Sequence, residues 1–258
     1  MTRVRLVAWH VFKESVRDRV LFAIAGFALL LVAVSILVGQ ITAGQDIKIV
    51  KDIGLAALEL AGVLMSVFTG VGLVSREIER RSIYSLLAKP VHRWEFVVGK
   101  YVGLVGTIVV NLALMAAVLL LLLGWLEGAM PDLGLLKAVA LILAELALLT
   151  AVALFFSTFS SSGILSAGLT LGVFVVGVFS QDLRGFSGIV NAPMLEAAVR
   201  GIGAIVPAFS AFDIKADVVN GRPPVSWAYV GMTVAYAGFY ASALVAGAIA
   251  VFARREFK

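Results

Sequence analysis

The sequence of 258 residues contains no cysteine and only two histidines, His10 and His92. The absence of cysteine excludes disulfides, thiolate metal sites and cysteine nucleophiles. Charged residues are also scarce: they make up 14% of the chain, whereas about a quarter of a soluble domain is charged. Apolar residues reach 61%, and runs of about 20 of them leave no polar face for water. These deficits predict a polytopic membrane protein without a large soluble domain.

Six apolar segments are long enough to be predicted as membrane spans, because about 20 apolar residues in a helix cross a bilayer. We therefore expect an all-α protein with spans at residues 20–40, 53–74, 101–124, 135–156, 163–180 and 228–252. Residues 1–19 place apolar side chains at helical spacing and basic ones mostly elsewhere, which is typical of an amphipathic helix in the membrane interface. A solvated basic tail is the alternative interpretation of that segment.

The formal net charge of +5 is distributed unevenly. Most Lys and Arg residues lie in the N-terminal segment, in the loop between the second and third spans, and at the C-terminus. The positive-inside rule then predicts a multi-pass protein of the cytoplasmic (inner) membrane with both termini cytoplasmic. Residues 181–227 hold most of the six prolines, and we expect amphipathic or re-entrant segments there, on the outer face.

The most charge-dense stretch is the predicted cytoplasmic loop, residues 75–100. Within it Ile83, Leu86 and Leu87 share one helix face. Glu77 and Arg81 are spaced to form an ion pair, and a proline follows that ends the helix. A short amphipathic helix of this kind is suited to docking in a groove of another protein. The alternative is an ordinary basic loop that orients two spans.

This loop resembles the signature loop of ABC-2 type transporter permeases. The residues that carry the resemblance are Glu77, Glu79, Ser82, Ile83, Leu86, Leu87, Ala88, Lys89, Pro90, Val91, Arg93, Glu95, Phe96, Gly99 and Lys100. Ser82 departs from the threonine more often expected there but keeps the hydroxyl group. Among such permeases the chain is most similar to the subfamily containing the membrane subunit of the transporter for copper-site maturation of nitrous-oxide reductase.

The resemblance implies one transmembrane domain over residues 1–258, with an interfacial helix at 1–19, a coupling loop at 75–100 and an outer-face loop at 181–227. The coupling helix would dock on a separate cytoplasmic ABC ATPase that uses ATP and Mg²⁺. Two permease copies, or one copy and a related partner, would export a substrate or work mechanically on an extracytoplasmic partner. The residues implied in ATPase coupling are Glu77, Glu79, Arg80, Arg81, Ser82, Ile83, Leu86, Leu87, Lys89, Pro90 and Arg93.

The chain contains no P-loop sequence, so any ATP hydrolysis must come from another polypeptide. We expect the chain itself to be no enzyme and to bind no cofactor, metal or nucleic acid. An intramembrane hydrolase would need a base at membrane depth, but His10 and His92 both fall in the predicted cytoplasmic segments.

Two ionisable residues lie within predicted spans, where such residues are functional candidates by default. Glu145 is placed near the middle of the fourth span and Glu59 in the outer part of the second. We predict both as candidate pathway residues. The alternatives are a structural Glu145 carboxyl bonded to a neighbour such as Thr150 or Asn111, and a Glu59 that reaches the outer interface. An ion-coupled transporter or a non-transporting membrane anchor that uses Glu145 is the alternative function.

Pairs of small residues four positions apart permit close approach of membrane helices. The sequence offers three such pairs, which we predict to be packing contacts. They are Gly99 with Gly103, Gly168 with Gly172, and Ala243 with Gly247.

Overall fold

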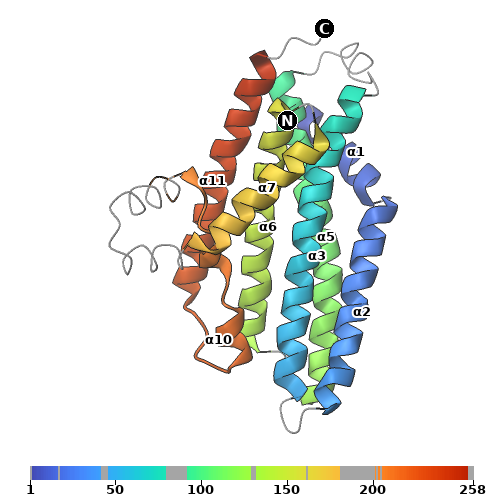
Figure 1. Cartoon of the computed structure of the whole chain (residues 1–258), viewed down its shortest axis with the longest axis vertical. Coiled ribbons are helices and arrows are strands. Elements are labelled where there is room, and N and C mark those ends of the chain that lie inside the picture. The colour runs from blue at the N-terminus through green and yellow to red at the C-terminus, as the bar shows by residue number, and fades with distance from the viewer. Residues whose placement is uncertain are drawn as a thin grey trace.

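A computed structural model describes residues 2–16, 18–41, 46–79, 92–128, 132–160, 162–180, 201, 203 and 205–254. The described residues form helices joined by turns, which agrees with the predicted all-α class, and the long helices lie side by side in one bundle (Figure 1). The elements are α1 (Thr2–Val16), α2 (Arg19–Ile41), α3 (Asp46–Glu79), α5 (Arg93–Glu127), α6 (Leu133–Phe159), α7 (Gly163–Val178), the 3₁₀ helix η1 (Phe209–Phe212), α10 (Lys215–Val219) and α11 (Trp227–Arg254).

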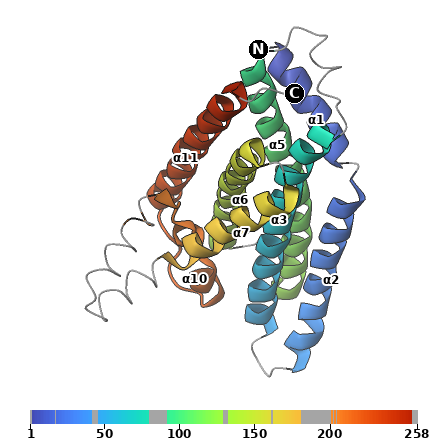
Figure 2. The same cartoon turned by 45° about the horizontal axis from the view of Figure 1, so that its top comes forward.

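Four helices, α3, α5, α6 and α11, are long and apolar enough to cross a membrane. Helices α1 and α2 are bent by 58° at a short break, and together they would count as a fifth span. Helix α7 has 16 residues, so it is about 24 Å long, less than the roughly 30 Å of a hydrocarbon core. It crosses the bundle obliquely (Figure 2). The chain is therefore a polytopic membrane protein, but the prediction of six spans, with 163–180 as one of them, is not confirmed.

Helix α6 is the centre of the bundle, packed against α3, α5, α7 and α11. Its sequence is mostly apolar, as expected of a largely buried helix, and Leu141, Leu148 and Ala151 are fully buried. Two side chains from neighbouring helices donate hydrogen bonds to its backbone: the Tyr101 hydroxyl lies 3.2 Å from the Ala147 carbonyl oxygen, and the Ser66 hydroxyl contacts the next carbonyl towards the N-terminus.

Three glycines at intervals of eight residues bring α3 close to its neighbours. A Cβ atom on Gly54 would lie 2.4 Å from the Leu119 side chain of α5. One on Gly62 would lie 2.2 Å from Leu146 of α6, and one on Gly70 would be equally crowded against that helix. These glycines let the helices approach to backbone distance. The sequence analysis looked for small residues four positions apart and therefore did not find these glycines, which are eight positions apart.

Of the three predicted small-residue pairs, Gly99 with Gly103 forms a close helix contact. A Cβ atom on Gly103 would lie 2.6 Å from the Ala8 carbonyl oxygen, so α1 packs directly on α5. Gly168 and Gly172 have nothing within 4 Å of such an atom among the described residues, and a Cβ atom on Gly247 would lie 3.1 Å from the Phe155 ring.

We expect Gly103→Ala to be less stable than the matched substitution Gly106→Ala on the same helix. Both gain about 1 kcal/mol of helix propensity, but only the methyl group at Gly103 meets backbone, since a Cβ on Gly106 would lie 3.6 Å from its nearest neighbour. Overpacking typically costs about 1–3 kcal/mol. Thermal unfolding in detergent measures the difference, and equal midpoints for the two variants would contradict this contact.

Candidate functional site

Most residues predicted to couple to an ATPase lie outside the part of the chain whose side chains the structure describes. Glu77 and Glu79 lie in the last turn of α3, but their side chains are not described. Outside the described residues altogether are Arg80, Arg81, Ser82, Ile83, Leu86, Leu87, Lys89 and Pro90. Arg93 is the predicted coupling residue that the structure places.

Both helices that flank the predicted loop extend into residues 75–100. Helix α3 continues beyond the predicted end of its span at 74, and α5 starts at Arg93 instead of near 101. The Glu95 carboxylate accepts a hydrogen bond of 2.9 Å from the His92 backbone N–H. This bond caps the start of α5, as acidic residues in a first helical turn commonly do.

Arg93 holds the C-terminal end of α11. Its Nη1 atom donates to the carbonyl oxygens of Ala253, at 2.8 Å, and Phe252, at 3.3 Å. A cation at the last carbonyls of a helix is stabilised by the helix dipole. One turn further along α5, the Phe96 ring stacks on the Phe252 ring with centroids 5.9 Å apart. Movement of the loop that precedes Arg93 would therefore act on α5 and α11 together.

Lys100 lies behind this contact and is 1% exposed. Its ammonium nitrogen stands 5.3 Å from the centroid of the Phe96 ring, an arrangement that favours a cation over an aromatic face. The α1 contact with Gly99 and Gly103 is on the same stretch of α5. The first turns of α5 thus join α1 and the end of α11 at one end of the bundle.

We predict that Arg93→Ala loosens the last turn of α11 without unfolding the bundle. An exposed, charge-assisted hydrogen bond contributes about 1 kcal/mol, which corresponds to roughly fivefold faster amide exchange where opening is local. Hydrogen exchange measured over residues 248–254 tests this. Arg254→Ala is the matched control, an exposed arginine on α11 itself, and unchanged exchange in Arg93→Ala would refute the contact.

At the opposite end of the bundle, residues 205–222, which we call the plug, fold back against the helices (Figure 1). Phe209 and Phe212 are each 1% exposed, and Phe209 packs on Phe174 of α7 with ring centroids 5.2 Å apart. Two tyrosines of α11 hold its backbone: the Tyr229 hydroxyl donates to the Ala211 carbonyl at 2.7 Å, and the Tyr236 hydroxyl accepts from a backbone N–H.

The plug brings Lys215 to Glu59 of α3, and the two side chains form a partly buried ion pair. Lys215 also lies 3.8 Å from the Asp213 carboxylate. Burial lowers the pKa of Lys215 from its ordinary value, and the negative charge of Asp52 opposes this shift. Glu59 is thus a contact between α3 and the plug. The two partners are 156 residues apart in the sequence, so no local sequence pattern could predict this ion pair.

Glu145 of α6 is 3% exposed, and the negative charge of Asp213 acts on it. The two neighbours considered as partners bond elsewhere: Thr150 donates to the Leu146 carbonyl at 2.7 Å, and Asn111 donates to the Thr107 carbonyl at 2.9 Å. Among the described residues, none hydrogen-bonds to the Glu145 carboxylate.

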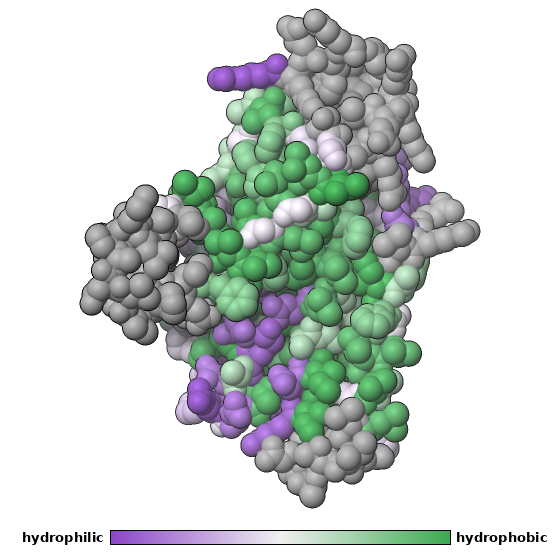
Figure 3. Space-filling view, in the orientation of Figure 1, coloured by the Kyte–Doolittle hydropathy of each residue, from purple (hydrophilic) through white to green (hydrophobic). Residues whose placement is uncertain are grey.

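We call Asp52, Glu59, Glu145 and Asp213, with Lys215 among them, the carboxylate cluster. Figure 3 shows hydrophilic side chains gathered at this end of the molecule, over α10 and the adjoining part of α3, beside a largely apolar surface. Within the described ranges no group of three or more His, Cys, Asp and Glu side chains converges as metal ligands would.

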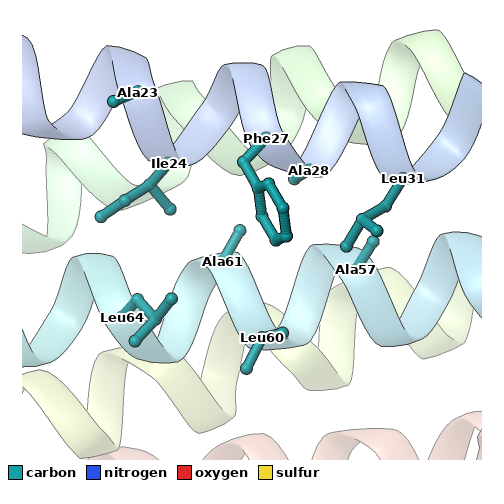
Figure 4. Close-up of a pocket in the computed structure, with 9 residues that line it drawn as sticks. All are labelled: Ala23, Ile24, Phe27, Ala28, Leu31, Ala57, Leu60, Ala61 and Leu64. Carbon is teal, nitrogen blue, oxygen red and sulfur yellow. The ribbon is translucent and has the colours of Figure 1, made fainter.

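An apolar pocket of about 300 Å³ lies between α2 and α3 (Figure 4). Phe27 reaches across it from α2 towards Ala61 of α3. The residues that line it are Ala23, Ile24, Phe27, Ala28, Leu31, Ala57, Leu60, Ala61 and Leu64. It contains no polar side chain that would orient a polar ligand, which sets it apart from the carboxylate cluster.

Comparison with known proteins gave one family. The model of that family, described as ABC-2 family transporter protein, matches residues 5–199, which is well over half of the chain and includes every described helix from α1 to α7. No curated protein matches the chain significantly.

Proposed function

Because this chain belongs to the ABC-2 family of transporter proteins, we propose that it is a permease subunit that couples ATP hydrolysis by a separate ATPase to the export of a substrate or to mechanical work on an extracytoplasmic partner. The observation that carries the proposal is the family match, which covers the helices up to α7 and the charged loop between α3 and α5. The family is a membrane component of transporters, and the chain has no P-loop of its own.

The contacts around the loop support a route for coupling. The loop joins α3 to α5, and Arg93 fastens the start of α5 to the end of α11. An ATPase that displaces the loop would shift these three helices around the central α6, opening one side of the bundle and closing the other. Two copies of the chain, or one copy and a related permease, with two ATPase subunits complete the proposed complex.

The finer placement in the nitrous-oxide-reductase maturation subfamily stays a prediction from the loop sequence. We also propose that Glu145 and Glu59 lie on the path of the substrate. The position of Glu145 supports this role, because its carboxyl group is buried in the most central helix and accepts no hydrogen bond from the described residues. The ion pair of Glu59 with the plug also supports it, because the plug packs on α3 and α6 beside Glu59.

Purification from the native membrane in mild detergent tests the proposed complex. We expect a stoichiometric P-loop protein to co-purify and to hydrolyse ATP in a vanadate-sensitive manner. Repeated isolation of the chain without an ATPase, under several gentle conditions, would contradict the proposal and favour an ion-coupled transporter or a membrane anchor.

The coupling loop is tested by the double variant Glu79→Ala with Arg81→Ala. We expect it to insert normally but to lose the co-purifying ATPase, because charged contacts at such an interface fix the docking register. The matched control is Lys13→Ala with Glu14→Ala, which removes one basic and one acidic exposed side chain from α1. Equal ATPase recovery from both double variants would exclude the loop as the docking site.

A further inference from the structure

The carboxylate cluster carries an excess of negative charge that the plug balances only in part. Three of its acidic side chains, Asp52, Glu59 and Asp213, share one ammonium group, that of Lys215. Two other basic side chains at this end, Lys51 and Lys137, have partners of their own. Lys51 pairs with Glu127 at 2.6 Å, and Lys137 donates to the Val225 carbonyl at 2.6 Å.

Glu145 provides a second and independent observation. Every side-chain oxygen and nitrogen that is sealed from solvent within the described part of the chain has a hydrogen-bond partner. The Glu145 carboxylate has no such partner there, although the residue is 3% exposed. Its oxygens therefore keep a small accessible area inside the bundle, within reach of the negative charge of Asp213. A buried carboxyl group that has no hydrogen-bond donor and feels the charge of another acid is suited to accept a cation.

The chemistry of the cluster favours an ammonium group over a metal ion. Metal ions need several oxygen ligands at about 2.0–2.6 Å, and the described acidic groups do not converge in that way. The side chain of Lys215 shows that the cluster accommodates an alkylammonium, since its nitrogen contacts Glu59 and Asp213. Phe212 and Ile214, which flank Asp213 in the sequence, are apolar and buried.

We propose that the carboxylate cluster binds an organic ammonium cation, held by Glu145 and Asp213, and that Lys215 competes with this ligand as a tethered internal cation. The inference rests on the proposed function in one respect: it takes the bound cation to be the class of substrate that the permease moves. Binding itself requires no ATPase.

Isothermal titration of the purified full chain in detergent with n-hexylammonium chloride tests the site. We expect saturable binding that is at least about tenfold tighter than that of hexanol or hexanoate, because charge-assisted hydrogen bonds to carboxylates discriminate by charge. Equal binding of hexanol would show partition into apolar surface or detergent and would overturn the proposal.

Three variants and a control separate the roles. Glu145→Gln keeps the shape of the side chain and should weaken binding about tenfold or more, and Asp213→Asn, at a half-exposed position, should weaken it in the same direction. Lys215→Ala should tighten binding, since the internal competitor is gone. Asp217→Asn on α10 should leave it unchanged, because that acid is paired with Arg222 outside the cluster.

The proposal is supported if hexylammonium binds saturably, more weakly to Glu145→Gln than to the wild type and more tightly to Lys215→Ala. It is also supported if Lys215→Ala alone binds the ammonium. No saturable binding to either the wild type or Lys215→Ala overturns it, as does unchanged binding in both Glu145→Gln and Asp213→Asn. If the ammonium does not bind but an ATPase still co-purifies with the chain, only the proposed substrate class is wrong. If the ammonium binds with the expected variant profile but no ATPase co-purifies, the proposed permease function is wrong instead.

Discussion

The close approach of α3 to α6 is the contact on which the candidate site depends. Lipid tails are as apolar as leucine, so membrane helices associate through tight packing of small residues instead of hydrophobic burial. Gly62 meets Leu146 without room for a Cβ atom, and the contact fixes the relative height of the two helices. Glu59 lies one turn before Gly62, and Glu145 directly precedes Leu146. The packing that stabilises the bundle therefore also sets two carboxyl groups at neighbouring heights on α3 and α6.

Helix α11 connects the two ends of the molecule. Its last carbonyls accept hydrogen bonds from Arg93 beside the charged loop, and its first half carries Tyr229 and Tyr236, which hold the backbone of the plug. It packs along α6 for much of its length. A helix is stiff along its axis, so displacement at the Arg93 end would be carried to the plug. Coupling between an ATPase and the carboxylate cluster then needs no chain of side-chain rearrangements through the core.

The sequence predicted the helices well where composition alone decides, because an uncharged run of about 20 residues has few alternatives to a membrane helix. It also singled out Glu145 and Glu59 by their depth. The structure adds how far two helices extend: α3 and α5 both continue into the charged loop, since helical hydrogen bonding continues beyond the apolar stretch that sequence can recognise. The partner of Glu59 was beyond reach, because Lys215 is brought to it by the plug and not by any local periodicity. Arg93 was assigned to an external contact, while its bonds to α11 depend on the tertiary structure.

The ion pair between Lys215 and Glu59 links the charge of the cluster to the position of the plug. Removal of one member of a partly buried pair leaves the other uncompensated, which is costly unless a new partner is supplied. A cation that enters beside Glu145 and Asp213 compensates the acids and lowers the cost of releasing Lys215. The plug would then lose its tie to α3 while its bonds to Tyr229 and Tyr236 persist, so it would follow α11 instead. Cation binding at the cluster and movement of α11 are therefore coupled. By thermodynamic linkage, cation binding favours the movement by the same free energy as the movement favours cation binding.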